Sequence, residues 1–291
     1  MLSTDETRQL DRLVLAPAGT PMPNAAGSRS ARARGFGTEF RDFRRYQAGD
    51  DPRAIEWSVY ARLGQLVLRS YRADAALRLH LLVDSSASMA AGQPDKLACA
   101  RRVATLLAYV AAHERDALGL ATFSDRLLTS MAPAGGRPQL IRVMAALDAI
   151  TPAGSSSLTR ALVDYANVTH GPGLVVILSD FFDPAGAWEG LHCLLHRGLA
   201  PAVIQVLAPE ELEPAIDDEQ ELVDAERPEA PPVTVTPAAV REYLQRLNAL
   251  TAELGEFCVT RGLPWLALRS SATFGDIVEG CRHAGLLGER L

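Results

Sequence analysis

Short apolar segments alternate with longer helical patterns along most of this chain, and this alternation restricts the fold more than any other feature. The expected strands are residues 77–83, 118–123, 174–178, 202–207 and 264–268, and the expected helices are residues 95–114, 137–149, 158–169, 186–196, 237–261 and 274–287. An alternation of this kind predicts an α/β fold, with a doubly wound, mostly parallel sheet and helices on both faces.

Changes in composition suggest how the chain is organised. Residues 1–34 contain three prolines with glycine, alanine and serine after a short helical start, which is typical of an arm or linker. Residues 35–76 are rich in arginine and aromatic residues, and we expect a smaller segment there that packs on the main domain. The main domain is expected to span residues 77–291, with an acidic insertion at about 209–232.

Three polar segments are expected to meet at one edge of the predicted sheet. Asp84, Ser86 and Ser88 form a DxSxS pattern directly after the first strand, and Asp180 follows a later apolar strand. Between them in the chain, Ser156 lies at the start of a helical pattern. Doubly wound sheets bind ligands in the crevice outside the carboxyl ends of their strands. We therefore expect these five residues to surround one point.

Two carboxylates and three hydroxyls form an all-oxygen shell, which suits magnesium, with manganese and calcium as alternatives. Such an ion keeps an open coordination position that an acidic residue of a partner protein is able to complete. Each member alone has a plainer explanation, because serine and aspartate also cap helices and form turns. The combination favours a metal site.

The charge of the chain is unevenly distributed and indicates partners of opposite sign. Ten arginines fall between Arg29 and Arg72, whereas residues 209–230 hold ten acids and one arginine. Aromatic residues interleave the basic stretch, as in proteins that bind single-stranded nucleic acid, but no signature of a nucleic-acid-binding fold accompanies them. We therefore expect a protein partner and not nucleic acid.

The sequence also carries expectations about the compartment. Its most apolar helical run is far shorter than the roughly 18 to 20 residues that a membrane crossing needs. The start, MLSTDETRQLDR, lacks the basic-then-apolar order of a secretory signal, and the four cysteines contain no CxxC pair. We expect a cytoplasmic protein with reduced thiols and no membrane association.

The order of DxSxS, hydroxyl and aspartate resembles the metal-ion-dependent adhesion site of von Willebrand factor A domains. The resemblance assigns Asp84, Ser86 and Ser88 to the first motif and Asp180 to the last. The threonine of that family falls on Ser156, because GSSSLTRAL aligns with the pattern GxTxxxxAL. Serine keeps the hydroxyl but loses the stiffness of a β-branched side chain. The family often has Asp-Gly at the last motif, whereas a phenylalanine follows the aspartate here.

A closer resemblance covers residues 35 to about 224 and is to the bacterial family of domain of unknown function fifty-eight. The matching hallmark comprises Gly35-Phe36-Gly37, Glu39-Phe40, Arg44-Arg45-Tyr46, Gly49-Asp50-Asp51-Pro52-Arg53, Ile55-Glu56-Trp57 and Ala61-Arg62. Members are commonly encoded beside a MoxR-type AAA ATPase, which implies an adaptor or chaperone-like role in complex assembly. We interpret the hallmark as a structural clamp on the main domain, with a docking surface for the ATPase as the alternative.

An enzyme is the competing hypothesis, because Asp84 also stands where phosphatases with a DxDxT loop carry their nucleophile. A divalent-metal-dependent phosphatase or other hydrolase would use it in that role. The second aspartate of such a loop is the general acid, worth typically about 10² to 10⁴-fold in rate, and Ser86 replaces it here. The sequence also contains no GxSxG nucleophile elbow. We therefore expect a metal-dependent protein-binding adaptor and not an enzyme.

Overall fold

The computed structural model describes residues 3–16, 39–45, 57–72, 77–183, 186–214, 220–222 and 233–290. The chain divides into two compact units, and each is considered by itself. The larger unit comprises Met1–Ala25 and Leu77–Leu291, and the smaller one comprises Ala26–Ala76.

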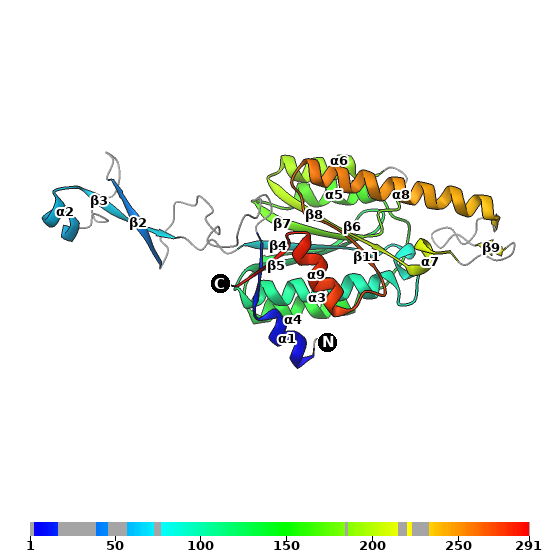
Figure 1. Ribbon diagram of the computed structural model, residues 1–291, viewed down its shortest axis with the longest axis horizontal. Coiled ribbons are helices and arrows are strands. Elements are labelled where there is room, and N and C mark those ends of the chain that lie inside the picture. Colours follow the sequence, from blue (N-terminus) through cyan, green and yellow to red (C-terminus); the bar gives the residue numbers. More distant parts are fainter. Residues whose placement is uncertain are drawn as a thin grey trace. The chain divides into compact units, whose positions relative to one another are not determined.

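A six-stranded sheet forms the centre of the larger unit, with the strand order β11-β8-β7-β4-β5-β6 (Figure 1). Its strands are β4 (Arg78–Asp84), β5 (Ala117–Phe123), β6 (Leu127–Ala134), β7 (Gly173–Ser179), β8 (Leu199–Leu207) and β11 (Trp265–Arg269). All neighbours run parallel except β5 and β6, which are antiparallel. The confirmed fold class is therefore α/β with a mostly parallel sheet.

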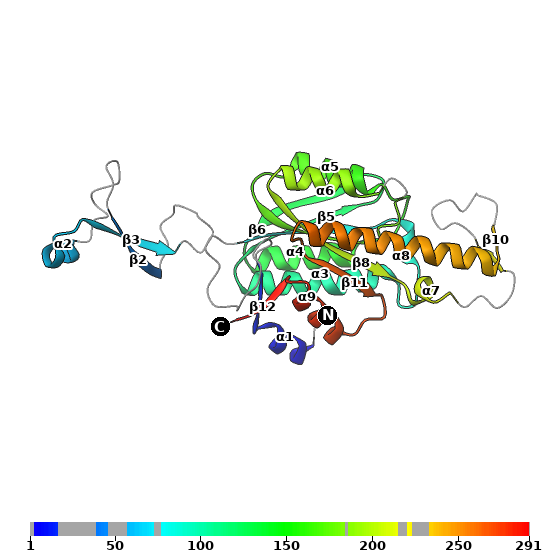
Figure 2. The ribbon, with the colours of Figure 1, turned by 45° about the horizontal axis from the view of Figure 1, so that its top comes forward.

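Helices cover both faces of this sheet, α3, α4 and α9 on one and α5, α6 and α8 on the other (Figures 1 and 2). They are α3 (Lys96–His113), α4 (Arg137–Asp148), α5 (Leu158–Val168), α6 (Trp188–His196), α8 (Pro237–Thr260) and α9 (Phe274–His283). The two layers explain why the central strands are apolar on both sides. In β4, Leu79, Leu81 and Val83 enter one core, whereas Leu82 enters the other.

Strand β6 was not expected from the sequence, and its position explains why. Most of its residues are exposed or half-buried, so LLTSMAPA carries no continuous apolar run. It lies at the edge of the sheet, where Pro133 is tolerated because one side of the strand needs no partner. The last helix also ends earlier than expected, and β12 (Leu287–Glu289) follows it.

The amino-terminal residues differ from the expected arm or linker. Within residues 3–16, α1 (Thr4–Leu10) and β1 (Leu13–Leu15) belong to the larger unit, and β1 pairs antiparallel with β12. Leu10, Leu13 and Leu15 are buried in the same core as α3. The prolines and small residues that suggested a linker begin only after this apolar set, so the short helical start is part of the fold.

Three short elements lie in the expected acidic insertion or directly after it, within the described residues. These are α7 (Pro209–Leu212), β9 (Gln220–Leu222) and β10 (Val233–Val235), and the two strands pair antiparallel.

None of the helices in the described ranges combines the length and the hydropathy that a membrane crossing requires.

In the residues of the smaller unit that the structure describes, there are an antiparallel pair of strands and a short helix. They are β2 (Glu39–Arg45), β3 (Val67–Arg72) and α2 (Trp57–Leu63). Parts of the family hallmark fall in β2 and α2, whereas residues 35–37, 46 and 49–56 lie outside the described residues.

A buried histidine on β4 makes the stability of the larger unit depend on pH. His80 is fully buried, and its Nδ1 lies 2.5 Å from the hydroxyl of Tyr165 on α5. A Cβ added at the neighbouring Gly173 would lie 2.6 Å from its Nε2, so the ring has little room to move. Burial, with a smaller contribution from Arg78, lowers the pKa of His80 from 6.5 to about 4.

We predict that acid destabilises the protein through His80. The folded-state pKa lies below the unfolded value, so the stabilisation is present above pH 6.5 and is lost as the pH falls from 6.5 to about 4, by roughly 3 kcal/mol. Urea unfolding at pH 7 and pH 4.5 measures this loss. His80→Gln, which does not titrate, should lose less stability over that range. An equal loss in both proteins would contradict the assignment.

Candidate functional site

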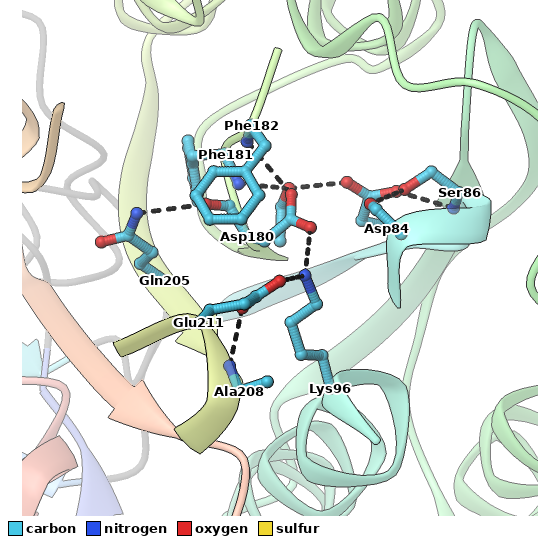
Figure 3. A network of polar contacts seen from close by, with 11 residues as sticks. Asp84, Ser86, Lys96, Asp180, Phe181, Phe182, Gln205, Ala208 and Glu211 are labelled. Carbon is cyan, nitrogen blue, oxygen red and sulfur yellow. Dashed lines mark hydrogen bonds and ion pairs between the residues drawn. The ribbon is translucent and has the colours of Figure 1, made fainter. Parts of the chain in front are cut away.

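Two carboxylates meet where the chain changes direction across the sheet. Asp84 is the last residue of β4, and Asp180 directly follows β7, the neighbouring parallel strand. From β4 the chain crosses to β5 on one side, whereas β7 lies on the other side. This switch point is where doubly wound sheets open a ligand crevice. Both aspartates are fully buried, and Figure 3 shows them at this edge of the sheet.

The Asp84 carboxylate is held by two hydrogen bonds. The backbone N–H of Ser86 donates to Oδ1 (2.9 Å), and the hydroxyl of Ser179 donates to Oδ2 (2.6 Å). These bonds favour the ionised form, but burial and then the charge of Asp180 outweigh them and raise the pKa of Asp84 to about 7. Within the part of the chain that the structure describes, no positively charged side chain forms an ion pair with this carboxylate.

Asp180 does form such an ion pair. Lys96, the first residue of α3, places its Nζ 2.7 Å from Asp180 Oδ2 and 2.5 Å from Glu211 Oε1 on α7 (Figure 3). Burial lowers the pKa of Lys96, but the two carboxylates more than offset this and the pKa is raised. Lys96 is therefore a buried ammonium that joins three elements of the fold.

Two of the predicted serines follow Asp84 on the same loop. Ser86 is buried and Ser88 half-buried, and their Oγ atoms are 3.1 Å apart at the short 3₁₀ turn Ala87–Ala90. Ser156 is half-buried on a third loop.

Backbone hydrogen bonds hold that third loop to the other two. Ala153 N–H donates to Ser85 O (2.8 Å), and Ala87 N–H donates to Gly154 O (2.9 Å). At its far end, the N–H of Leu158 donates to Asp183 Oδ2 (2.7 Å). The loops of the five predicted residues thus converge. Among the five predicted residues, side-chain contacts link Asp84 with the Ser86 backbone and Ser86 with Ser88.

The turn after β7 is tight and fixed from several sides. Ser179 Oγ accepts from Phe181 N–H (3.0 Å), and Asp180 Oδ1 accepts from Phe182 N–H (3.1 Å). The side chain of Gln205 on β8 donates to Asp180 O (3.1 Å) and accepts from the Thr251 hydroxyl on α8 (3.1 Å). Sheet and helix together hold the backbone of Asp180.

Phe181 adopts a left-handed backbone conformation, with φ of 62°. Glycine adopts this region without strain, whereas other residues pay roughly 1 kcal/mol or more. Von Willebrand factor A domains often have glycine at this position. Here the Phe181 side chain is almost completely buried, and this burial offsets the strain of the backbone.

We predict that Phe181→Gly is more stable than Phe181→Ala by about 1 kcal/mol, because both lose the ring and only glycine relieves the backbone. Chemical denaturation of the two variants measures the difference. Phe123, buried in strand β5, supplies the matched control, where alanine should be the more stable substitution. The same order at both positions would contradict the strain.

Sequence reasoning missed Lys96, Ser179 and Glu211. Ser179 comes directly before a predicted ligand, but the ion pairs of Lys96 span 84 and 115 residues and follow no local pattern. One signal was available. Lys96 is the single lysine of the sequence, among 28 arginines.

The donor set fits a hard divalent cation. Asp84, Asp180 and Glu211 carry three negative charges if ionised, and Lys96 carries one positive charge, which leaves a formal charge of −2. Among the residues that the structure describes, no three His, Cys, Asp or Glu side chains converge on one point. The remaining ligands would therefore be serine hydroxyls, which suit magnesium, manganese or calcium better than softer metals.

Most of the chain is similar to known proteins in sequence. The profile of the family described as "Protein of unknown function DUF58" matches residues 42–253. An uncharacterized protein of Mycobacterium tuberculosis is 27% identical over 251 residues, which cover 84% of this chain and 79% of the relative.

Two solved structures are similar to this chain at a lower level. The conserved hypothetical protein BatB from Bacteroides thetaiotaomicron is 16% identical, with a TM-score of 0.41 and coverage of 71% of this chain and 100% of BatB. A von Willebrand factor type A protein from Catenulispora acidiphila is 9% identical, with a TM-score of 0.41 and coverage of 76% and 43%.

Proposed function

The chain belongs to the family described as "Protein of unknown function DUF58", and from the site that it carries we propose a metal-dependent protein-binding adaptor. The observation that supports this proposal best is the pair of buried aspartates at the switch point of the sheet. Among the described residues, the Asp84 carboxylate accepts from neutral donors and pairs with no cation, so a divalent cation would supply the missing charge.

The proposed ligands are Asp84, Ser86, Ser88, Ser156 and Asp180, and magnesium is the expected ion. When bound, the ion would offer an electrophilic position to an acidic residue of a partner protein. The two carboxylates balance the charge of the ion only formally, and the hydroxyls are weak neutral donors, so the ion would remain electrophilic toward an anionic partner. The protein contributes the buried carboxylates and the backbone bonds that keep the three loops together.

The proposed partner is a MoxR-type AAA ATPase in the cytoplasm, where the complex would serve assembly or maturation of other proteins. This part of the proposal rests on the family resemblance. A non-enzymatic role agrees with the groups around Asp84. A phosphatase loop carries its general acid two positions after the nucleophile, and here that position is Ser86, whose hydroxyl lies 3.1 Å from Ser88 Oγ.

Titration calorimetry with magnesium and manganese tests the metal site. We expect saturable binding by the unaltered protein and a loss of at least about tenfold in Asp84→Asn, because a charged ligand is removed while its shape is kept. Asp148→Asn on the exposed end of α4 is the matched control and should bind as the unaltered protein does. Equal binding in Asp84→Asn, or its failure to fold, would contradict the assignment.

Co-purification tests the partner. The MoxR-type ATPase of the same organism should be retained on immobilised protein in magnesium and released by EDTA. Asp84→Asn should fail to retain it even in magnesium, because the ion that bridges the two proteins is missing. Retention that is independent of both EDTA and Asp84 would place the contact elsewhere on the chain.

A further inference from the structure

The basic residues of this chain are almost uniform in kind. Arginine occupies 28 of the 29 lysine and arginine positions, and the exception is Lys96. Lys96 is also fully buried, and lysine is rarely buried unless its charge is paired. The one place where the sequence uses a compact ammonium is therefore beside a proposed metal ligand.

The surroundings of Lys96 explain why an ammonium fits there. Its Nζ lies between Asp180 Oδ2 (2.7 Å) and Glu211 Oε1 (2.5 Å), and 5.0 Å from the centre of the Phe182 ring. A guanidinium is wider and planar, with donors spread over a fork, whereas an ammonium is a point charge that fits between two oxygens. Figure 3 shows Lys96 reaching from α3 between the two carboxylates.

We propose that Lys96 is a resident cation of the metal site, which competes with the divalent ion for Asp180 and so sets the affinity of the site. The inference rests on the proposed function. Asp180 Oδ2 is already engaged by the ammonium, and Oδ1 accepts from Phe182 N–H. An incoming divalent ion must therefore displace the ammonium from Asp180 or bind against its repulsion, and either event weakens binding.

Glu211 makes displacement of the ammonium feasible. Its Oε1 contacts Lys96, while its Oε2 accepts from the N–H of Ala208 at the start of α7 (2.7 Å). When Lys96 separates from Asp180, it keeps this second carboxylate and is not left as an unpaired buried charge, which would be strongly destabilising. Glu211 thus keeps the displaced ammonium paired beside the site.

The double variant Lys96→Met/Glu211→Gln tests the proposal with the charge of the site held constant. It removes one positive and one negative group, so the formal charge stays at −2, and removal of a paired set is tolerated better than removal of one partner. We expect it to bind manganese on the order of tenfold more tightly than the unaltered protein in calorimetry. Glu210→Gln, an exposed neighbour, is the control and should change nothing.

The possible outcomes separate this inference from the proposed function. If the unaltered protein binds manganese and the double variant binds equally or more weakly, the inference is wrong and the metal site stands. If only the double variant binds, Lys96 occupies the site and the inference holds. If neither protein binds, both the inference and the metal site are wrong.

A second readout uses the uniqueness of the lysine. In protein labelled with ¹⁵N only at lysine side chains, Lys96 gives the single ammonium signal. Magnesium should shift that signal in the unaltered protein, in proportion to binding, and leave it unchanged in Asp84→Asn. A signal that does not move while magnesium saturates the protein would overturn the proposal.

Discussion

A buried ammonium and a larger number of buried carboxylates hold the carboxyl edge of the sheet together. Lys96 from α3 contacts Asp180 after β7 and Glu211 on α7, so one side chain joins helix α3 to two other segments at this edge of the sheet. Charges removed from water are tolerated only when their partners are well placed, so these contacts fix the positions of three elements. Asp84, close to the same cluster, forms no ion pair with a cation among the described residues.

This imbalance gives the site its chemical character. A fully neutralised cluster would stabilise the fold but would attract no ion. Here the hydrogen bonds from Ser86 and Ser179 orient the Asp84 carboxylate without cancelling its charge. The strained turn at Phe181 belongs to the same arrangement, because it directs the backbone N–H groups of the turn onto Ser179 and Asp180. Strain of this kind persists only where the surrounding structure over-determines the backbone.

The sheet and the convergence of its loops could be predicted because both follow from periodicity. Parallel strands bring their carboxyl ends to one edge, so Asp84 and Asp180 had to approach each other once β4 and β7 were recognised. Two features escaped this reasoning for different reasons. The pairing of β1 with β12 joins the two ends of the chain and depends on tertiary contacts, and edge strand β6 has no apolar run to reveal it.

The cation of the site escaped for a third reason. A lysine in the first turn of a helix is ordinarily read as a solvated residue, and only the folded chain shows that two distant carboxylates enclose it. The composition did point to this residue, because Lys96 is the single lysine in a sequence that otherwise uses arginine. Glu211 was equally hidden, as one of ten acids in a segment that periodicity assigns to no element.

The solitary lysine has a consequence for the surface as well. Lysine acetylation, isopeptide conjugation and amine-reactive cross-linkers all modify an ε-amino group, and the only one in this sequence lies in the interior between two carboxylates. The exterior of the protein therefore offers such chemistry no lysine at all. The surface therefore binds other molecules through guanidinium, carboxylate and aromatic groups. Any regulatory covalent modification of the surface must occur on side chains other than lysine.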